Sequence, residues 1–242
     1  MAIVLRMPGE IYQESGHIEN GTFHGRWHFN FGDNYDPEHM NFGILRVFND
    51  DILSPGATWP LHPHRQNEVV TYCAAGEFRH ADENGVGGIL HQGGVQHTTV
   101  GTGMWHSEIN NRPDEPMRFI QMWFFPRVPD LEPAVQQKQT EKEDRTGHWL
   151  PLVSNDHDGA LPINADAAVY ASLLPARQVL SFTLGKGMGA YLYVLEGGPV
   201  ALDGEVMTAL TAAMIQGQPE FTVTAEEEAE LLLVEVALEV ER

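Results

Sequence analysis

The chain has 242 residues, which is enough for one large domain or for two domains of about 100–150 residues. Its 42% hydrophobic and 9% aromatic content is that of a folded globular protein and excludes a disordered chain. The formal net charge of −20, from 34 acidic against 14 basic residues, argues against direct binding to nucleic acid or to an anionic membrane.

The N-terminal segment and the cysteine count bear on the cellular compartment. No apolar run approaches the roughly 20 residues that a membrane-spanning helix needs. Residues 1–8 lack the charged region and long apolar core of a signal peptide. Cys73 is the only cysteine, so an intrachain disulfide is excluded. We therefore predict a cytoplasmic protein without membrane contacts.

Short strands separated by turns are predicted along the first half of the chain. Residues 45–47 alternate apolar and polar, as half-buried strands do. The β-rich segment 68–76 is followed by Asn84-Gly85, a dipeptide that predicts a hairpin turn. Residues 117–126 form an apolar strand in which Gln121 interrupts one face. Such strands at intervals of about ten residues are typical of an antiparallel barrel or sandwich.

Two pairs of polar residues with metal-ligand chemistry lie between Gly56 and Asn110. One residue separates His62 from His64, and one residue separates His106 from Glu108. In a strand, residues i and i+2 point to the same face. If the two strands face each other across a barrel, one cavity receives three imidazoles and a carboxylate. That set suits a divalent transition metal and leaves room for water or substrate.

The composition changes after residue 127. Residues 128–147 contain prolines and a long polar run, which predicts an exposed connector. A second β-rich block then repeats the rhythm of strand, glycine and strand. We predict an all-β protein with an N-terminal domain (1–127), a connector (128–147) and a C-terminal domain (148–242).

The second block lacks the ligand pattern of the first. Placing Gln216-Gly217 beside Gln92-Gly93 aligns His106 with Glu230. The histidines of the second half are His148 and His157. We therefore expect the metal site in the first domain and a structural role for the second.

These motifs resemble those of the cupin superfamily. The first reads Gly56-x5-His62-x-His64-x3-Glu68, and the second reads Gly103-x2-His106-x3-Asn110. The stretch from Glu68 to Gly76 is one residue longer than the usual cupin spacing.

Within the cupins, further motifs resemble the pirin family. These are His62-Pro-His64-Arg65, Thr71-Tyr72, His80-x-Asp82 and Gly101-x-Gly103-x2-His106-Ser107-Glu108. Three further motifs resemble the bacterial pirin-like quercetinases. These are Trp27-His28-Phe29-Asn30-Phe31, Tyr35-Asp36-Pro37 and Leu45-Arg46-Val47-x-Asn49-Asp50-Asp51. The resemblance covers roughly residues 5–175 and is weaker in the second block.

The resemblance implies a bicupin, in which two antiparallel β-barrels of the jelly-roll type pack face to face. It implies a monomer with one metal ion in the N-terminal barrel, held by His62, His64, His106 and Glu108. Iron(II) is the expected ion, and nickel, zinc, copper or manganese are alternatives. Glu68 matches a ligand of many cupins, but in pirins that role belongs to the residue matching Glu108. We therefore expect Glu68 beside the ligands or in a structural role.

Three other residues are candidates to line the pocket. His97 stands where relatives commonly carry an apolar residue. If it faces the cavity, it could polarise a substrate or relay a proton; otherwise it lies outside the barrel. Met104 and Trp105 precede His106, and one of them is expected to wall the pocket unless both only pack the core.

Two functions follow from the resemblance. The first is a dioxygenase that opens the central ring of quercetin-like flavonols with O2 and releases CO, with Glu108 as general base. The alternative is a non-catalytic, metal-binding regulator of the redox-sensing pirin type. An enclosed pocket large enough for a three-ring phenol favours the enzyme, whereas a shallow site beside an exposed apolar patch favours the regulator.

Overall fold

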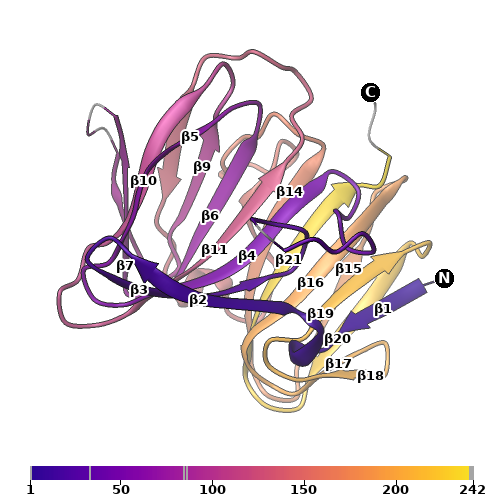
Figure 1. The fold of residues 1–242 in the computed structure, drawn as a ribbon. Coiled ribbons are helices and arrows are strands. Elements are labelled where there is room, and N and C mark those ends of the chain that lie inside the picture. The colour runs from indigo at the N-terminus through magenta and orange to yellow at the C-terminus, as the bar shows by residue number, and fades with distance from the viewer. Residues whose placement is uncertain (1, 33, 84, 86, 240–242) are drawn as a thin grey trace.

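The computed structural model describes residues 2–32, 34–83, 85 and 87–239, and these fold almost entirely into β-strands (Figure 1). This confirms the predicted all-β class. Within the described residues, helix is limited to two short 3₁₀ turns, η1 (Pro8–Glu10) and η2 (Glu143–Arg145). Neither has the length or the apolar character to cross a membrane.

The N-terminal module consists of two antiparallel sheets that face each other (Figure 1). The larger sheet has seven strands in the order β12 (Ala134–Lys138), β9 (Val95–Thr99), β6 (Glu68–Ala75), β11 (Met117–Phe124), β4 (Leu45–Leu53), β3 (Gly21–Trp27) and β2 (Tyr12–Ile18). The smaller sheet has four strands in the order β5 (Thr58–His64), β10 (Met104–Asn110), β7 (Glu77–Asp82) and β8 (Ile89–His91).

The C-terminal module has the same two-sheet construction. Its larger sheet has six strands in the order β1 (Ala2–Arg6), β19 (Ala212–Gln216), β16 (Met188–Gly197), β21 (Ala229–Ala237), β14 (Ala167–Leu174) and β13 (Leu150–Val153). Its smaller sheet has four strands in the order β15 (Val179–Thr183), β20 (Glu220–Ala225), β17 (Val200–Leu202) and β18 (Glu205–Met207). Each module is thus a two-sheet jelly roll rather than one continuous hydrogen-bonded barrel.

The two modules repeat one strand order. The order β5-β10-β7-β8 corresponds to β15-β20-β17-β18, and β9-β6-β11-β4 corresponds to β19-β16-β21-β14. The counterpart of β10 is therefore β20, so the predicted alignment of His106 with Glu230, a residue of β21, is wrong. The two Gln-Gly pairs are not equivalent in the fold, because Gln92-Gly93 precedes β9 whereas Gln216-Gly217 lies at the end of its counterpart β19.

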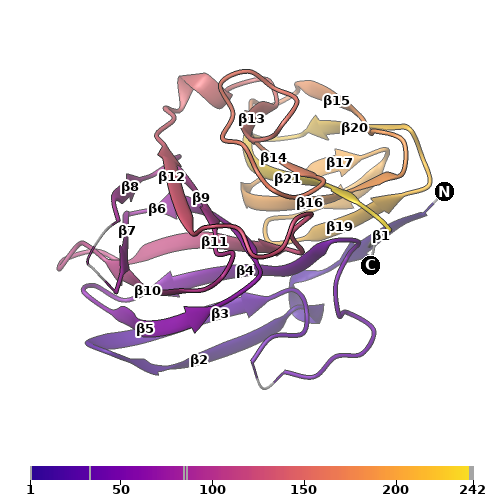
Figure 2. The same cartoon turned by 90° about the horizontal axis from the view of Figure 1, so that it is seen from above.

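The larger sheets of the two modules pack face to face, as predicted (Figure 2). Their shared core includes Phe48, Val70, Tyr72, Ile120 and Met122 from one sheet and Val169, Tyr191, Leu232 and Val234 from the other. Because side chains alternate along a strand, the opposite faces of the same strands line the interiors of the modules. Each larger sheet is therefore buried on both faces.

Two edge strands cross the predicted domain boundaries. Strand β1 pairs with β19, so residues 2–6 belong to a sheet of the C-terminal module. Strand β12 lies within the predicted connector but pairs with β9 of the N-terminal module. The division at residues 127 and 147 stays a prediction.

The strands on either side of the predicted Asn84-Gly85 turn pair antiparallel, and Asn84 itself lies outside the described residues.

A buried ion pair joins the modules at Asp50. Arg118 donates two hydrogen bonds of 2.8 and 2.7 Å to this carboxylate, and the Tyr193 hydroxyl of the C-terminal module donates a third of 2.7 Å. Burial alone raises the pKa of a carboxyl, but the hydrogen bonds and charge of Arg118 outweigh it and lower the pKa of Asp50. Asp50 is thus ionised and held in place at the module interface.

We expect Asp50→Ala to lower the free energy of unfolding by about 3 kcal/mol, because it leaves the charge of the half-buried Arg118 without its fully buried partner. Denaturant unfolding measures this difference. The control is Asp114→Ala, which removes an exposed carboxylate from Arg112 and should leave stability almost unchanged. Equal losses in the two variants would contradict a special role for the interface pair.

Candidate metal centre

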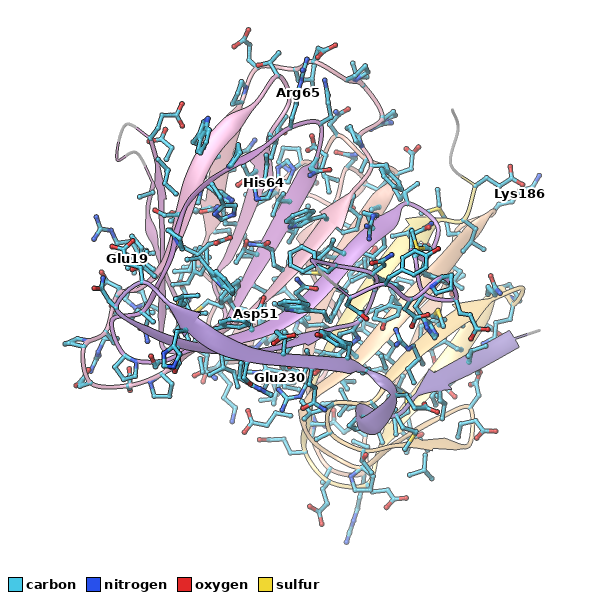
Figure 3. All side chains as sticks on the ribbon, in the orientation of Figure 1. Glu19, Asp51, His64, Arg65, Lys186 and Glu230 are labelled. Atoms are coloured by element: carbon cyan, nitrogen blue, oxygen red, sulfur yellow. The ribbon has the colours of Figure 1, made fainter. Side chains whose placement is uncertain are left out.

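Three histidines meet inside the N-terminal module. The ligand nitrogens of His62, His64 and His106 all lie within 4.8 Å of one another. His62 and His64 come from β5, and His106 comes from β10, where it pairs directly with His62. Figure 3 shows His64 between the two sheets, with Arg65 at the rim. The predicted placement of β5 and β10 across a barrel is wrong, since they are hydrogen-bonded neighbours in one sheet.

Glu108 lies beside this histidine group. Its carboxylate oxygens are 3.9 Å from His62 Nε2 and 3.8 Å from His106 Nε2. The pairing of β10 with β5 shifts between His106 and Glu108 because β5 has an extra residue there, and both His106 and Glu108 are buried. Gln121 of β11 donates a hydrogen bond of 2.6 Å to Glu108 Oε1 from the opposite sheet. This contact fixes the carboxylate next to the imidazoles.

The protonation of the histidines suits metal binding. The pKa of His64 is lowered to about 4 and that of His106 to about 3, by burial first and then by the neighbouring imidazoles. The Nε2 atoms of both residues are buried without a hydrogen-bond partner. His62 Nδ1 lies 2.8 Å from the Pro60 carbonyl oxygen, which can only accept, so the tautomer that donates to it leaves the lone pair on Nε2. Neutral imidazoles with free nitrogens fit a divalent transition metal.

His80 supports the ligand set from behind. Its Nε2 lies 3.0 Å from His106 Nδ1, and its side chain is buried. If His106 presents Nε2 to a metal, its Nδ1–H donates to His80, which fixes the orientation of the ring. Sequence spacing gives His80 no role, because its neighbour β10 follows more than twenty residues later.

We expect His80→Phe to weaken metal affinity about 10–100-fold, because His106 loses its hydrogen-bond acceptor. His80→Gln supplies an amide oxygen at that place and should restore much of the affinity. Competition with a chelator measures both variants. The exposed His91→Phe is the control, and a His80→Phe protein with unchanged affinity would rule out the positioning role.

A cavity of about 270 Å³ opens onto the ligand group. Its lining combines aromatic side chains with polar groups. The lining residues are Trp27, Phe31, Asn49, Asp51, Trp59, Pro60, His62, His64, Glu108, Phe119, Gln121 and Trp123. Burial raises the pKa of Asp51 to about 8, although the Trp27 indole donates a hydrogen bond to it. At neutral pH this carboxyl is mostly protonated and can donate a hydrogen bond.

Glu68 and His97, for which a place near the ligands was one of two alternatives, lie on the other face of the sheet. They contact each other at 2.7 Å, and Glu68 also accepts a hydrogen bond of 3.3 Å from the Asn164 backbone N–H. Side chains alternate between the two faces of each strand. Thr71 and its partner Gln121 are on the face that lines the module interior, whereas Glu68 and His97 are on the face toward the C-terminal module. Of the two alternatives given for each residue, these contacts favour a structural role for Glu68 and a place outside the barrel for His97.

Met104 and Trp105 also lie outside the cavity lining. Met104 is buried against Val69 and Val100 and packs the core below the ligands. Trp105 points outward from β10 and is 48% exposed. Of the two alternatives, a wall of the pocket or core packing, Met104 fits the second and Trp105 fits neither. Trp123 and other aromatic residues line the cavity instead. The polar Gln121, two residues before Trp123 on the same face of β11, was the sequence feature that could have indicated this face.

Comparisons with known proteins agree with this fold. A family model described as Pirin matches residues 11–124, and one described as Quercetinase C-terminal cupin domain matches residues 151–236. A Pseudomonas aeruginosa protein named "Putative quercetin 2,3-dioxygenase" is 39% identical over 93% of this chain and 97% of its own. A "Pirin-like protein" of Caulobacter vibrioides is 37% identical with the same coverage.

A solved structure extends the likeness to three dimensions. The bacterial pirin YhhW of Escherichia coli, in complex with nickel(II), has a TM-score of 0.90 and 26% identity. The match covers 99% of this chain and 100% of that chain. With the family match in the module that carries the histidines, and with relatives similar over nearly their whole length, the chain belongs to the pirin family.

Proposed function

We propose that His62, His64, His106 and Glu108 hold one divalent transition metal. The support is the cluster of free imidazole nitrogens, two of which are buried without a partner. Iron(II) is our first expectation, and nickel, zinc, copper and manganese are alternatives, since affinity alone does not select among these ions. The nickel(II) in a similar bacterial pirin supports a transition metal without fixing which one.

We further propose that the protein is a dioxygenase of flavonol-like substrates. The observation that carries this proposal is the cavity walled by Trp59, Phe119 and Trp123, which opens directly onto His62 and His64. Flat aromatic walls suit the stacked rings of a polyphenol. The names of several relatives as quercetin 2,3-dioxygenases support the same substrate class.

The residues of the cavity have distinct roles in this proposal. When bound, the metal supplies Lewis acidity and open coordination positions. Glu108 takes the proton of the flavonol 3-hydroxyl, because its carboxylate stands at the junction of the cavity and the ligands. Gln121 holds Glu108 Oε1, and the protonated Asp51 donates a hydrogen bond to a substrate oxygen. The aromatic walls exclude water from the reacting ring.

The overall reaction balances without a further reductant. One flavonol and one O2 give one ring-opened ester and one CO, so both oxygen atoms enter the products and one ring carbon leaves. The substrate supplies all the electrons that O2 accepts. This stoichiometry gives the reaction a distinctive gaseous product.

The test is metal analysis combined with quercetin and O2 consumption and CO release. The apo-protein is loaded in separate samples with each of the five candidate metals. We expect about one ion per chain and equal amounts of quercetin lost and CO formed with at least one metal. Metal binding without CO release in any sample would overturn the dioxygenase proposal but leave the metal site standing.

That outcome would favour the second candidate, a metal-dependent regulatory protein. Leu61 and Trp105 are each 48% exposed on the strands that carry the histidines, which gives the outer surface of the smaller sheet apolar side chains. Exposed apolar groups of this kind suit contact with a partner protein. Trp105→Ser should then abolish partner binding while leaving metal content unchanged.

A further inference from the structure

The C-terminal module contains a second and larger cavity of about 1140 Å³. Lys186 is at its rim, and Figure 3 shows this residue on the far side of the molecule from His64. Side chains of β14, β15 and β21 line it, and these strands correspond to β4, β5 and β11 of the N-terminal module. The second cavity is therefore lined by the counterparts of three strands that line the cavity of the N-terminal module.

The second cavity has apolar side chains on the strands that correspond to the ligand-bearing strands of the N-terminal module. The strands that correspond to β5 and β10 are β15 and β20, and their paired inward side chains include Phe182 with Phe221 and Leu180 with Val223. The lining also contains Trp149 and Tyr170, and both rings contact Phe182 edge to face. Among the described residues, the group of close metal-binding side chains lies in the other module. The second cavity thus has an aromatic wall in place of a metal site.

Carboxylates accompany this aromatic wall. Glu235 of β21 is half-buried, and its Oε1 accepts a hydrogen bond of 2.7 Å from the Gly185 backbone N–H. Burial raises the pKa of Glu235, and the charge of Asp156 raises it further. Burial and the charges of Glu235 and Asp156 likewise raise the pKa of Tyr170 to about 12, while His157 contacts the Tyr170 hydroxyl at 3.2 Å. Within the same lining, the Gly185 hydrogen bond and the charge of His157 lower the pKa of Glu235 and so partly oppose the effects of burial and Asp156.

The charges of the lining leave an excess of carboxylates. Apart from His157, whose charge depends on its protonation, the charged residues there are Asp156, Asp166, Glu235, Glu239, Arg127 and Lys186. Arg127 and Asp166 form an ion pair of 3.4 Å. Setting this pair aside leaves three carboxylates against one ammonium group, an excess of two negative charges.

We propose that this second cavity binds a small organic cation, namely an ammonium group carried on an aromatic or alkyl body. Glu235 and Asp156 hold the ammonium group, while Trp149, Tyr170 and Phe182 contact the body and offer ring faces to the charge. The proposal does not depend on the reaction in the N-terminal module. It assigns a ligand to the module for which the sequence predicted only a structural role.

The test is calorimetric titration with three probes of the same size. Phenethylammonium carries the proposed charge, 2-phenylethanol is neutral, and phenylacetate is an anion. We expect the ammonium probe to bind at least about tenfold more tightly than the other two. Equal binding of the three probes, or no binding of the ammonium probe, would overturn the proposal.

Variants locate the site. Glu235→Gln and Asp156→Asn should each weaken binding of the ammonium probe about tenfold, and Phe182→Leu should weaken it further through lost ring contact. Asp156 lies on an exposed loop, so its variant tests the site without risk to the fold. Glu227→Gln, an exposed acid outside the cavity, is the matched control. Binding that is unchanged in both acid variants, or lost on His106→Ala, would place the probe elsewhere and refute the proposal.

Discussion

Replacing Glu108 with glutamine is expected to lower quercetin turnover by about 10²–10⁴-fold per bound metal, the usual contribution of a general base. The glutamine keeps the size of the side chain and one oxygen that could coordinate. It removes the negative charge and nearly all of the basicity, so the flavonol proton loses its acceptor. Quercetin loss and CO release at matched metal content measure the effect.

The control for this experiment is Glu83→Gln, in which the changed carboxylate contacts the backbone of Trp105 outside the cavity. It should keep the turnover of the wild type. Gln121→Leu extends the test, because it removes the hydrogen bond to Glu108 and should reduce turnover less than loss of the carboxylate. A Glu108→Gln protein as active per metal as the wild type would show that another group takes the proton.

The double variant His62→Ala, His106→Ala is expected to lose its metal almost completely, from about one ion per chain to below about one tenth, because two of the four proposed ligands are gone. Elemental analysis after dialysis measures this directly. Turnover should disappear with the metal. Thermal unfolding should show that the apo variant is still folded, since the large sheets pack away from the site.

The matched control is His17→Ala, His91→Ala, which removes two exposed histidines from the same module. It should keep a full complement of metal. If the variant without His62 and His106 still binds one ion per chain, as the control does, the assignment of the site to these two residues is contradicted.

The ligand candidates were predictable from the sequence because their geometry is local. A spacing of two residues in a strand fixes the relative direction of two side chains, whatever the rest of the fold does. His62 with His64, and His106 with Glu108, therefore share a face as expected. The all-β class was predictable for the same reason, from short strands and glycine turns.

The remaining residues of the site depend on pairing between distant strands. Gln121 reaches Glu108 from the opposite sheet, and His80 reaches His106 because β7 lies beside β10. No local spacing encodes either contact. Glu68 and His97 show why two alternatives stayed open from the sequence, since each lies close in sequence to the site but on the face of its strand that points away from the cavity. A change of one residue in register moves a side chain from one face to the other.

The pairing of β1 with β19 also bears on the order in which the protein is made. Arg6 pairs with Ala212, so β1 leaves the ribosome about 206 residues before its partner strand. At about 5–20 residues per second, this apolar strand waits about 10–40 s with its backbone hydrogen-bonding groups unpaired. During that interval the segment Ile3-Val4-Leu5 is an exposed β-strand sequence of the kind that chaperones bind and that can pair with another nascent chain.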